Sequence, residues 1–287
     1  MSTIAPHNRP ILLATDLTSR CDRAFDRAVR LARDWGVPLV ALHVVERFAG
    51  ERRWRRDDTA EMMRRDLSQD VQENEIDLEI VIKDGDVATA VLAVAAEKDC
   101  GLIVTGTARH DGMTDTALGS AVEEMVPRSP LPVLVVKQRP RNDYRRIIVG
   151  SDFSEPSARA IMIASDLFPG ASITVINSFT APGSKWIDSE SARDQVEAMQ
   201  KKLAQEFEET IGSAGSSLGR RDYVIEHGSP DEIICDYIVD RQIDLAVFGT
   251  HGRTGFRKAI MGSVAAQLMR RVGCDVLMVG KTSENRA

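Results

Sequence analysis

Glycines recur at a fixed spacing near the end of the chain, in the segment GTHGRTGFRKAIMGS at residues 249–263. The pattern follows an apolar run, precedes a helix-like run, and reads Gly249-x2-Gly252-x9-Gly262-Ser263. Glycine lets a backbone approach a ligand closely and adopt φ values that a Cβ forbids. The amides of such a loop and the following helix N-terminus form a site for phosphate. We therefore predict a loop that holds nucleotide phosphates, to which positive charge is added by Arg253, Arg257 and Lys258.

An aspartate, Asp152, follows the apolar run at residues 147–150 and could also contact a ligand. Its carboxylate could hydrogen-bond a ribose or a base, or help to hold a metal through water. The same segment is a good helix start, so Asp152 could instead cap the next helix together with Ser154. We prefer ligand contact for Asp152 and allow both roles. Asp16 has the same ambiguity, and there we prefer the cap.

The chain is a duplication, because similar blocks recur at one offset. Two blocks recur 143 residues later in the chain: Gly106-Thr107 recurs as Gly249-Thr250, and Gly119-Ser120 recurs as Gly262-Ser263. The first aspartates lie only 136 residues apart, so the second copy has gained seven residues between its second and third strands. A length of 287 residues fits two domains of ordinary size, with a polar boundary near residues 137–144. We predict domains at 1–139 and 144–282.

Apolar runs and amphipathic stretches alternate within each copy, which indicates parallel βαβ units. Five strands and four helices per copy predict a doubly wound α/β sheet. In the first copy, strands are expected at 11–14, 38–45, 78–83, 102–106 and 132–136, and helices at 21–35, 59–73, 87–97 and 121–126. If strands one and four are neighbours, the aspartate and the glycine loop face one crevice at the carboxyl ends of the strands.

The composition excludes several classes of protein. A formal net charge of -6 argues against general nucleic-acid binding, and the basic cluster at residues 52–56 is interpreted as a solvated helix entrance. The four cysteines show no zinc spacing, and Cys100 and Cys235 are expected to be buried thiols. No apolar run is long enough to span a bilayer and no signal region is found, so we expect a cytoplasmic protein without membrane contact.

Signatures of other nucleotide enzymes are missing from the sequence. It has no G-x-G-x-x-G after the first strand, no G-x4-GK[ST] and no G-x-S-x-G elbow. Apart from Asp152, no carboxylate near the second loop is an evident Mg²⁺ ligand for phosphoryl transfer. His251, inside the loop, has no evident partner and is expected to face solvent. The pattern favours binding over fast catalysis, and no catalytic residue is assigned.

The duplicated five-strand domain, the aspartate after strand one and the glycine loop after strand four resemble the universal stress protein family in its tandem form. The resemblance covers essentially the whole chain and implies the nucleotide-binding, α/β hydrolase-like fold of that family. It also implies ATP as the ligand, with or without Mg²⁺. Ser178 falls at the adenine position, where the family usually has an apolar residue. The other positions implied to contact ATP are Ser151, Asp152, Phe248, Gly249, Gly252, Gly262, Ser263 and Val264.

The first copy departs from this pattern, since Arg109 stands where the second copy has Gly252. Residues 107–118 carry a formal charge of -1, against +3 for residues 250–261. Two unit charges about 4 Å apart at an effective dielectric near 20 interact by about 4 kcal/mol. The difference in charge between the two loops could therefore decide which of them binds a nucleotide. We predict one nucleotide per chain, held by the second copy. Arg109 could still contact a phosphate, which leaves the first site open.

Three functions remain open at this point. The first is an ATP-binding regulatory protein of the stress response. The second is a slow ATPase or an autophosphorylating enzyme, with Ser263 or Thr254 as the acceptor. The third is a scaffold that needs no nucleotide. The final strand of each copy would have an unpaired edge, so we also predict that the copies pair within the chain as a pseudo-dimer, and leave homodimerisation open.

Overall fold

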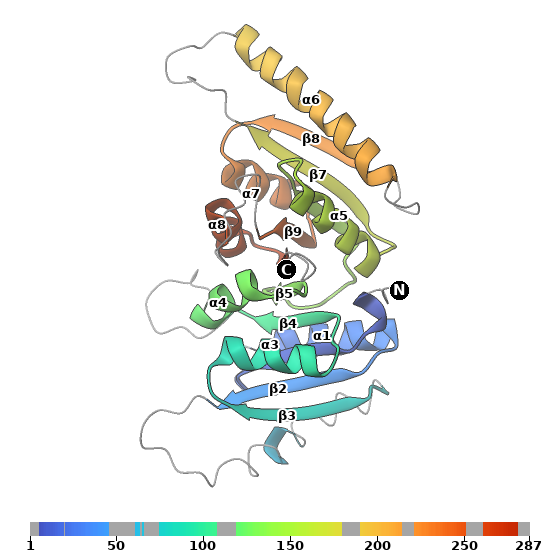
Figure 1. Cartoon of the computed structure of the whole chain (residues 1–287), viewed down its shortest axis with the longest axis vertical. Coiled ribbons are helices and arrows are strands. Elements are labelled where there is room, and N and C mark those ends of the chain that lie inside the picture. Colours follow the sequence, from blue (N-terminus) through green and yellow to red (C-terminus); the bar gives the residue numbers. More distant parts are fainter. Residues whose placement is uncertain are drawn as a thin grey trace, which may run out of the picture. The chain divides into compact units, whose positions relative to one another are not determined.

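The computed structural model divides the chain into two compact units, one that comprises the residues up to Asp143 together with Gly280, and one from Tyr144 to Val279 (Figure 1). It describes residues 6–19, 21–45, 61–63, 65, 75–107, 119–179, 190–213, 221–250 and 261–280. Each unit is described by itself. The domain limits 1–139 and 144–282 remain a prediction.

In the described part of the first unit, five strands alternate with helices. The strands are β1 (Ile11–Thr15), β2 (Leu39–Val45), β3 (Leu78–Asp84), β4 (Leu102–Gly106) and β5 (Val133–Val136). The helices are η1 (Pro6–Asn8), α1 (Asp22–Trp35), α3 (Val87–Glu97) and α4 (Ser120–Arg128). Apart from η1, which was not predicted, these elements match the predicted ones to within about two residues at each end. Most of the helix expected at 59–73 lies outside the described residues.

The second unit repeats this order. Its strands are β6 (Arg146–Gly150), β7 (Ser172–Phe179), β8 (Asp222–His227), β9 (Leu245–Gly249) and β10 (Asp275–Val279). Its helices are α5 (Glu155–Leu167), α6 (Glu190–Ser213), α7 (Pro230–Asp240) and α8 (Ser263–Arg271). By the strand register, the offset between the copies falls from 136 at the first strand to 134 at the second and rises to 143 at the third, so the net gain of seven residues is nine gained between β7 and β8, where α6 lies, and two lost between β6 and β7.

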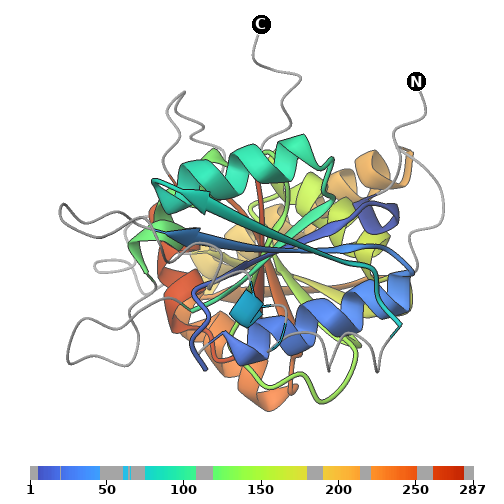
Figure 2. The same cartoon turned by 90° about the horizontal axis from the view of Figure 1, so that it is seen from below.

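Both sheets are parallel and have the same strand order. That order is β3-β2-β1-β4-β5 in the first unit and β8-β7-β6-β9-β10 in the second. The first strand therefore lies beside the fourth in each unit, as predicted, and the order reverses between them. In the first unit, Figure 2 shows α1 on one face of the sheet and α3 on the other. The prediction of two tandem doubly wound α/β domains is confirmed.

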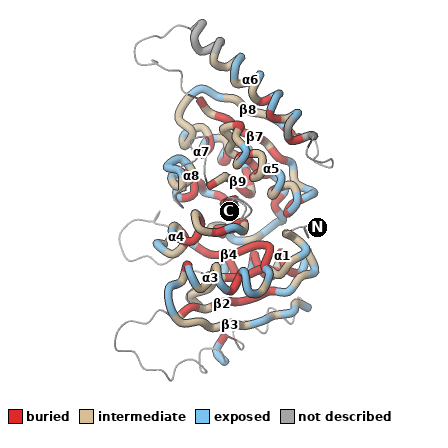
Figure 3. The backbone as a smooth tube through the Cα atoms, viewed as in Figure 1, coloured by how far each residue is buried: buried red, intermediate tan, exposed pale blue. Residues whose placement is uncertain are grey.

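Apolar residues on both faces of the central strands form the cores. Every residue of β4, β5 and β10 is buried, whereas the outer strand β3 has no buried residue (Figure 3). Such burial on both faces explains why these strands read as continuous apolar runs rather than as alternating patterns. The carboxyl ends of the strands are thus fixed by a rigid sheet.

Candidate functional site

The carboxyl ends of β6 and β9 bring two predicted site segments to one edge of the second sheet. Gly150, the last residue of β6, pairs in register with Phe248 of β9. The turn that begins at Ser151 and the segment that begins at Gly249 therefore leave neighbouring strands at the same level. This is the topological switch point, where ligands bind in open α/β sheets.

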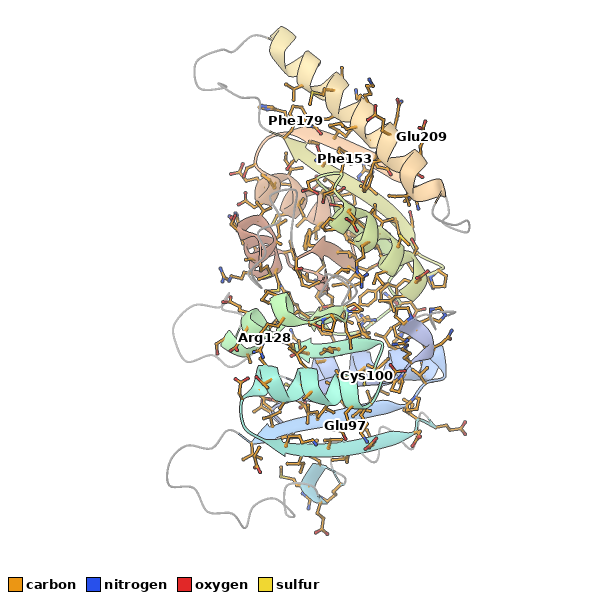
Figure 4. All side chains as sticks on the ribbon, in the orientation of Figure 1. Glu97, Cys100, Arg128, Phe153, Phe179 and Glu209 are labelled. Atoms are coloured by element: carbon orange, nitrogen blue, oxygen red, sulfur yellow. The ribbon has the colours of Figure 1, made fainter. Side chains whose placement is uncertain are left out.

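The turn after β6 is held by its own polar groups. Ser151 N–H donates to the Ile176 carbonyl at 2.9 Å, and the Ser151 hydroxyl accepts the Phe153 N–H at 3.0 Å. Phe153 has a φ of 59°, which is uncommon for a residue with a side chain. Its ring packs edge-on against Phe207 of α6, with ring centroids 5.5 Å apart (Figure 4). The turn is therefore braced by α6 as well as by β7.

The Asp152 carboxylate lies at the centre of a small hydroxyl cluster. Its Oδ1 accepts the Ser154 N–H at 3.2 Å, the Ser157 hydroxyl at 2.7 Å, and the Ser154 hydroxyl. The Asp152 N–H in turn donates to the Ser157 hydroxyl at 3.2 Å. These bonds hold the turn before α5, but none of them reaches a backbone N–H of the helix, and the N-cap residue Ser154 makes no side-chain cap bond, so the capping role weighed for Asp152 and Ser154 is not seen in the structure. Ligand contact by the same carboxylate remains a proposal.

The end of β7 presents a buried amide beside the predicted base position. Asn177 is 7% exposed, and its Nδ2 donates to the Ser151 carbonyl at 2.8 Å. In the first unit His43 occupies the matching position, with Nδ1 3.0 Å from the Thr15 carbonyl. Ser178, the next residue, is half-buried and pairs in register with Glu226 of β8. The register gives Ser178 the same place in its sheet as Val44, as the sequence predicts.

Phe248 contributes to the site differently from its neighbours. Its side chain is only 3% exposed and lies over Gly150, where an added Cβ would meet the ring at 2.7 Å. A side chain enclosed in this way is part of the core. The side chain of Phe248 is therefore not available to a ligand.

The two ends of the glycine segment meet at the start of α8. Gly262 N–H donates to the Thr250 carbonyl at 2.9 Å, and Thr250 N–H donates to the Val279 carbonyl at 3.0 Å. Ser263 and Val264, in the first turn of α8, are exposed, and Gly262 provides no side-chain cap. The predicted residues Gly252 and Arg253, like His251, Thr254, Arg257 and Lys258, lie outside the described residues.

Gly262 is not required to be glycine by the packing or by the backbone. Its φ is -58°, and an added Cβ would meet only the Thr250 carbonyl, at 3.8 Å. A positive φ, one of the two reasons for expecting glycine, therefore does not apply here. The remaining reason to expect glycine at this position is the close approach of a ligand to the backbone.

The first unit has a thiol where the second has a hydroxyl. Cys21 precedes α1 at the position of Ser157 and interacts with the backbone and carboxylate of Asp16. Burial raises the pKa of the Cys21 thiol to about 11, against a smaller lowering by the Asp16 N–H. Asp16 Oδ1 also accepts the Thr18 N–H at 2.9 Å and its hydroxyl at 2.7 Å. Arg109 lies outside the described residues.

The remaining polar candidates form no metal centre in the described part of the chain, where no group of three or more His, Cys, Asp or Glu could hold an ion. Cys100 is buried as predicted, and burial raises its pKa to about 12. The expectation for Cys235 was wrong, since it is half-exposed on α7.

Among the described residues no helix is long and apolar enough to cross a membrane.

Comparison with known proteins identifies the family of this fold and motif. The sequence model of the universal stress protein family matches residues 7–137 and again 143–280. The chain belongs to the universal stress protein family. The two matches cover nearly all of both units, so the resemblance expected from the glycine loop and the strand-end aspartate is confirmed in its tandem form.

Several relatives share this family. Universal stress protein MJ0531 of Methanocaldococcus jannaschii is 24% identical over 143 residues, 49% of this chain and 84% of that protein. Universal stress protein E of Escherichia coli is 38% identical over 55 residues, 19% of this chain. Its homolog from Haemophilus influenzae is 23% identical over 66% of this chain. The chain spans 17% of the Escherichia coli protein and 65% of the Haemophilus one.

Solved structures show the same fold over the full length. A universal stress protein from Archaeoglobus fulgidus has a TM-score of 0.71 at 19% identity, covering 96% of this chain and 99% of its own. A protein of unknown function, PA1789 from Pseudomonas aeruginosa, also has a TM-score of 0.71, at 21% identity, covering 95% and 92%. These similarities support the fold of the whole chain.

Sequence reasoning missed the residues that hold the strand-end turns. Asn177 and His43 were not linked to the site, and Ser157 and Cys21 were not linked to the aspartates. The offset of 136 residues between the two aspartates also relates Cys21 to Ser157, so the alignment of the copies contained that signal.

Proposed function

We propose that the second unit binds ATP where β6 and β9 end, and that the chain is a nucleotide-dependent regulator of the stress response. The observation that carries this proposal is the environment of Gly262. Neither its φ nor its neighbours require glycine, so the residue type is explained by a ligand that passes close to the backbone.

The residues around Gly262 suit a phosphate group. The first turn of α8 has exposed residues and no side-chain cap, so its amide N–H groups can donate to an anion at the positive end of the helix. Arg253, Arg257 and Lys258 would add three positive charges to the same segment. Mg²⁺ would come with the nucleotide, held by phosphate oxygens.

The base and the sugar would lie toward β6 and β7. The Ser178 hydroxyl offers a hydrogen bond at the position proposed for the base. Asp152 and Ser151 are positioned by the hydroxyl cluster and by Asn177, so the carboxylate would meet a ribose without further ordering. We propose that Phe248 and Gly249 contribute main-chain contacts only.

The test is the nucleotide content of the gently purified chain, measured by quantitative chromatography after denaturation. We expect about one ATP per chain, and binding of added Mg·ATP by calorimetry. Gly262→Ala should weaken binding at least tenfold, because the new methyl group occupies the path of the phosphates. Gly119→Ala, the same change at the same helix start in the first unit, should leave binding unchanged. Gly252→Asp, which adds a negative charge to the loop, should abolish it.

Two results would overturn the proposal. A nucleotide-free protein that also fails to bind Mg·ATP would leave a scaffold function. Equal loss of ATP from the Gly119 and Gly262 variants would contradict the assignment to the second unit. Thermal unfolding of each variant controls for a loss of fold, because a change from glycine to alanine at a helix N-cap also costs a fraction of a kcal/mol to about 1 kcal/mol.

A further inference from the structure

The outer edge of the second sheet offers main-chain groups away from the nucleotide site. β8 is the last strand of this sheet and pairs only with β7 in the described part of the chain. Gly228 N–H donates to the Phe179 carbonyl, so the main chain at Gly228 points toward β7. Because direction alternates along a strand, the main-chain groups of Tyr223 and Ile225 point outward. An edge of this kind is a template for another strand.

A groove of about 720 Å³ lies between this edge and α6, the helix beside β8 in Figure 1. On the α6 side its lining includes Ala204, Gln205 and Glu208, and on the strand side Tyr223, Ile225 and Glu226. A groove between a helix and an edge strand is the setting in which extended peptides bind by strand addition.

A polar cluster connects the helix to the strand. Glu208 of α6 accepts Arg221 Nε at 3.1 Å and Nη2 at 2.5 Å, and also the Tyr223 hydroxyl. Partial burial opposes the charge of Glu208, but the bonds from Arg221 and Tyr223 outweigh it and lower its pKa. In the first unit the register places Leu78 and Ile80 at the positions of Arg221 and Tyr223. The cluster is therefore particular to the second unit.

Of the charged side chains that line the groove, one carboxylate has no partner of opposite charge among the described residues. Lys201 pairs with Glu197 at 2.5 Å, and Arg221 pairs with Glu208. Glu226 of β8 is exposed and has no ion pair among the residues that the structure describes. It lies on the opposite face of the strand from Ile225, because successive side chains alternate.

We propose that β8 and α6 bind an extended peptide segment of a partner protein as an added strand. An apolar residue of the segment lies beside Ile225 under α6, and a basic residue lies beside Glu226 on the other face. The recognised pattern is an alternation of apolar and basic residues over about six positions, the length of β8. This binding does not depend on the nucleotide.

The test uses three fluorescent eight-residue peptides and the full chain. The first alternates valine or isoleucine with lysine and threonine, the second has glutamate for lysine, and the third is the first with alternate N-methyl groups. Fluorescence anisotropy should show that the lysine peptide binds about fivefold more tightly than the glutamate peptide, the scale of one cross-strand charge pair. N-methylation should abolish binding, because it removes the main-chain hydrogen bonds of an added strand.

A charge exchange on the protein tests the position. Glu226→Lys should reverse the preference between the lysine and glutamate peptides. Glu209→Lys is the matched control, since Glu209 is exposed on α6 and does not line the groove (Figure 4), and it should leave the preference unchanged. The proposal is overturned if the lysine peptide does not bind at millimolar concentration. It is also overturned if N-methylation has no effect, or if both variants shift the preference equally.

Discussion

At the scale of single residues, the two units hold the turn after their first strand with different side chains. Each has an aspartate after its first strand, followed by a residue at positive φ, Leu17 or Phe153. The aspartate is held by the residue five positions later, Cys21 in the first unit and Ser157 in the second. A thiol and a hydroxyl are both small groups that can donate to a carboxylate and accept from an N–H. The turn therefore tolerates the exchange.

Cys21 should be unreactive in the folded protein at pH 8. Burial raises the pKa of its thiol to about 11, and alkylation requires the thiolate. We expect the rate of iodoacetamide labelling at Cys21, followed by mass spectrometry, to rise about tenfold per pH unit and to level off only near pH 11. Labelling at pH 8 as fast as in the urea-unfolded chain would contradict this.

The same shift has a consequence for stability. The folded thiol holds its proton above the ordinary value of 9.0, so folding favours the protonated form. The contribution of Cys21 to the free energy of unfolding is therefore complete below pH 9 and is lost as the pH rises toward 11. Cys21→Ser, which copies the second unit, should remove this part of the pH dependence.

At the scale of elements, the contact between the first and fourth strands uses complementary sizes. The second unit pairs Gly150 with Phe248, and the first pairs Ala14 with Thr105 at the same register. The large ring fills the space that the missing Cβ leaves. The pair lies at the last level of β6, directly before the turn that carries Ser151 and Asp152.

Gly150→Ala should destabilise the protein by about 1–3 kcal/mol, because the new methyl group would overlap the Phe248 ring. Phe248→Thr alone should cost about 3–5 kcal/mol through the cavity it leaves. The double variant, which recreates the pair of the first unit, should lose less stability than the sum of the two single losses. The coupling energy between the two positions is measured by urea denaturation of the wild type, both single variants and the double variant. Strict additivity of the two losses would refute the size argument.

At the scale of the whole molecule, the segment that leaves the first unit is bound to that unit by arginines of α1. Arg23 donates to the Lys137 carbonyl at 2.7 Å, Arg27 to the Asn142 carbonyl at 2.9 Å, and Arg30 to the Arg141 carbonyl at 3.2 Å. Arg27 is only 4% exposed. The polar stretch after β5 is therefore held along α1 rather than free.

Arg27→Ala should release this stretch and expose it to trypsin, which can cleave after Lys137 and Arg141 but not between Arg139 and Pro140. Loss of a hydrogen bond from a charged group costs about 1.5–3 kcal/mol, so we expect cleavage about tenfold faster or more. Limited proteolysis with mass spectrometry gives the rates. Arg159→Ala, on the matching helix of the second unit, should leave cleavage at these two sites unchanged. Equal acceleration by both variants would indicate general loosening instead.

The sequence by itself determined the duplication, the strands and helices, and the family. These follow from local signals: strands buried on both faces are continuously apolar, glycine and aspartate mark strand ends, and the duplication keeps a constant offset. Pro132 was placed in the last strand of the first copy, but β5 begins at Val133; the Pro132 carbonyl accepts the Ile103 N–H of β4 at 3.1 Å, whereas proline has no N–H of its own to donate.

Only the tertiary structure decided which side chains meet across elements. Asn177 reaches Ser151, Phe248 covers Gly150, and Glu208 joins Arg221, each across a sequence separation that no local pattern encodes. Strand order is settled by how helices pack on the sheet, so the neighbours β6 and β9 could be proposed but not established from the sequence. The hydroxyl cluster around Asp152 and the place of Phe248 in the core emerged for the same reason: burial and hydrogen-bond partners are properties of the folded chain.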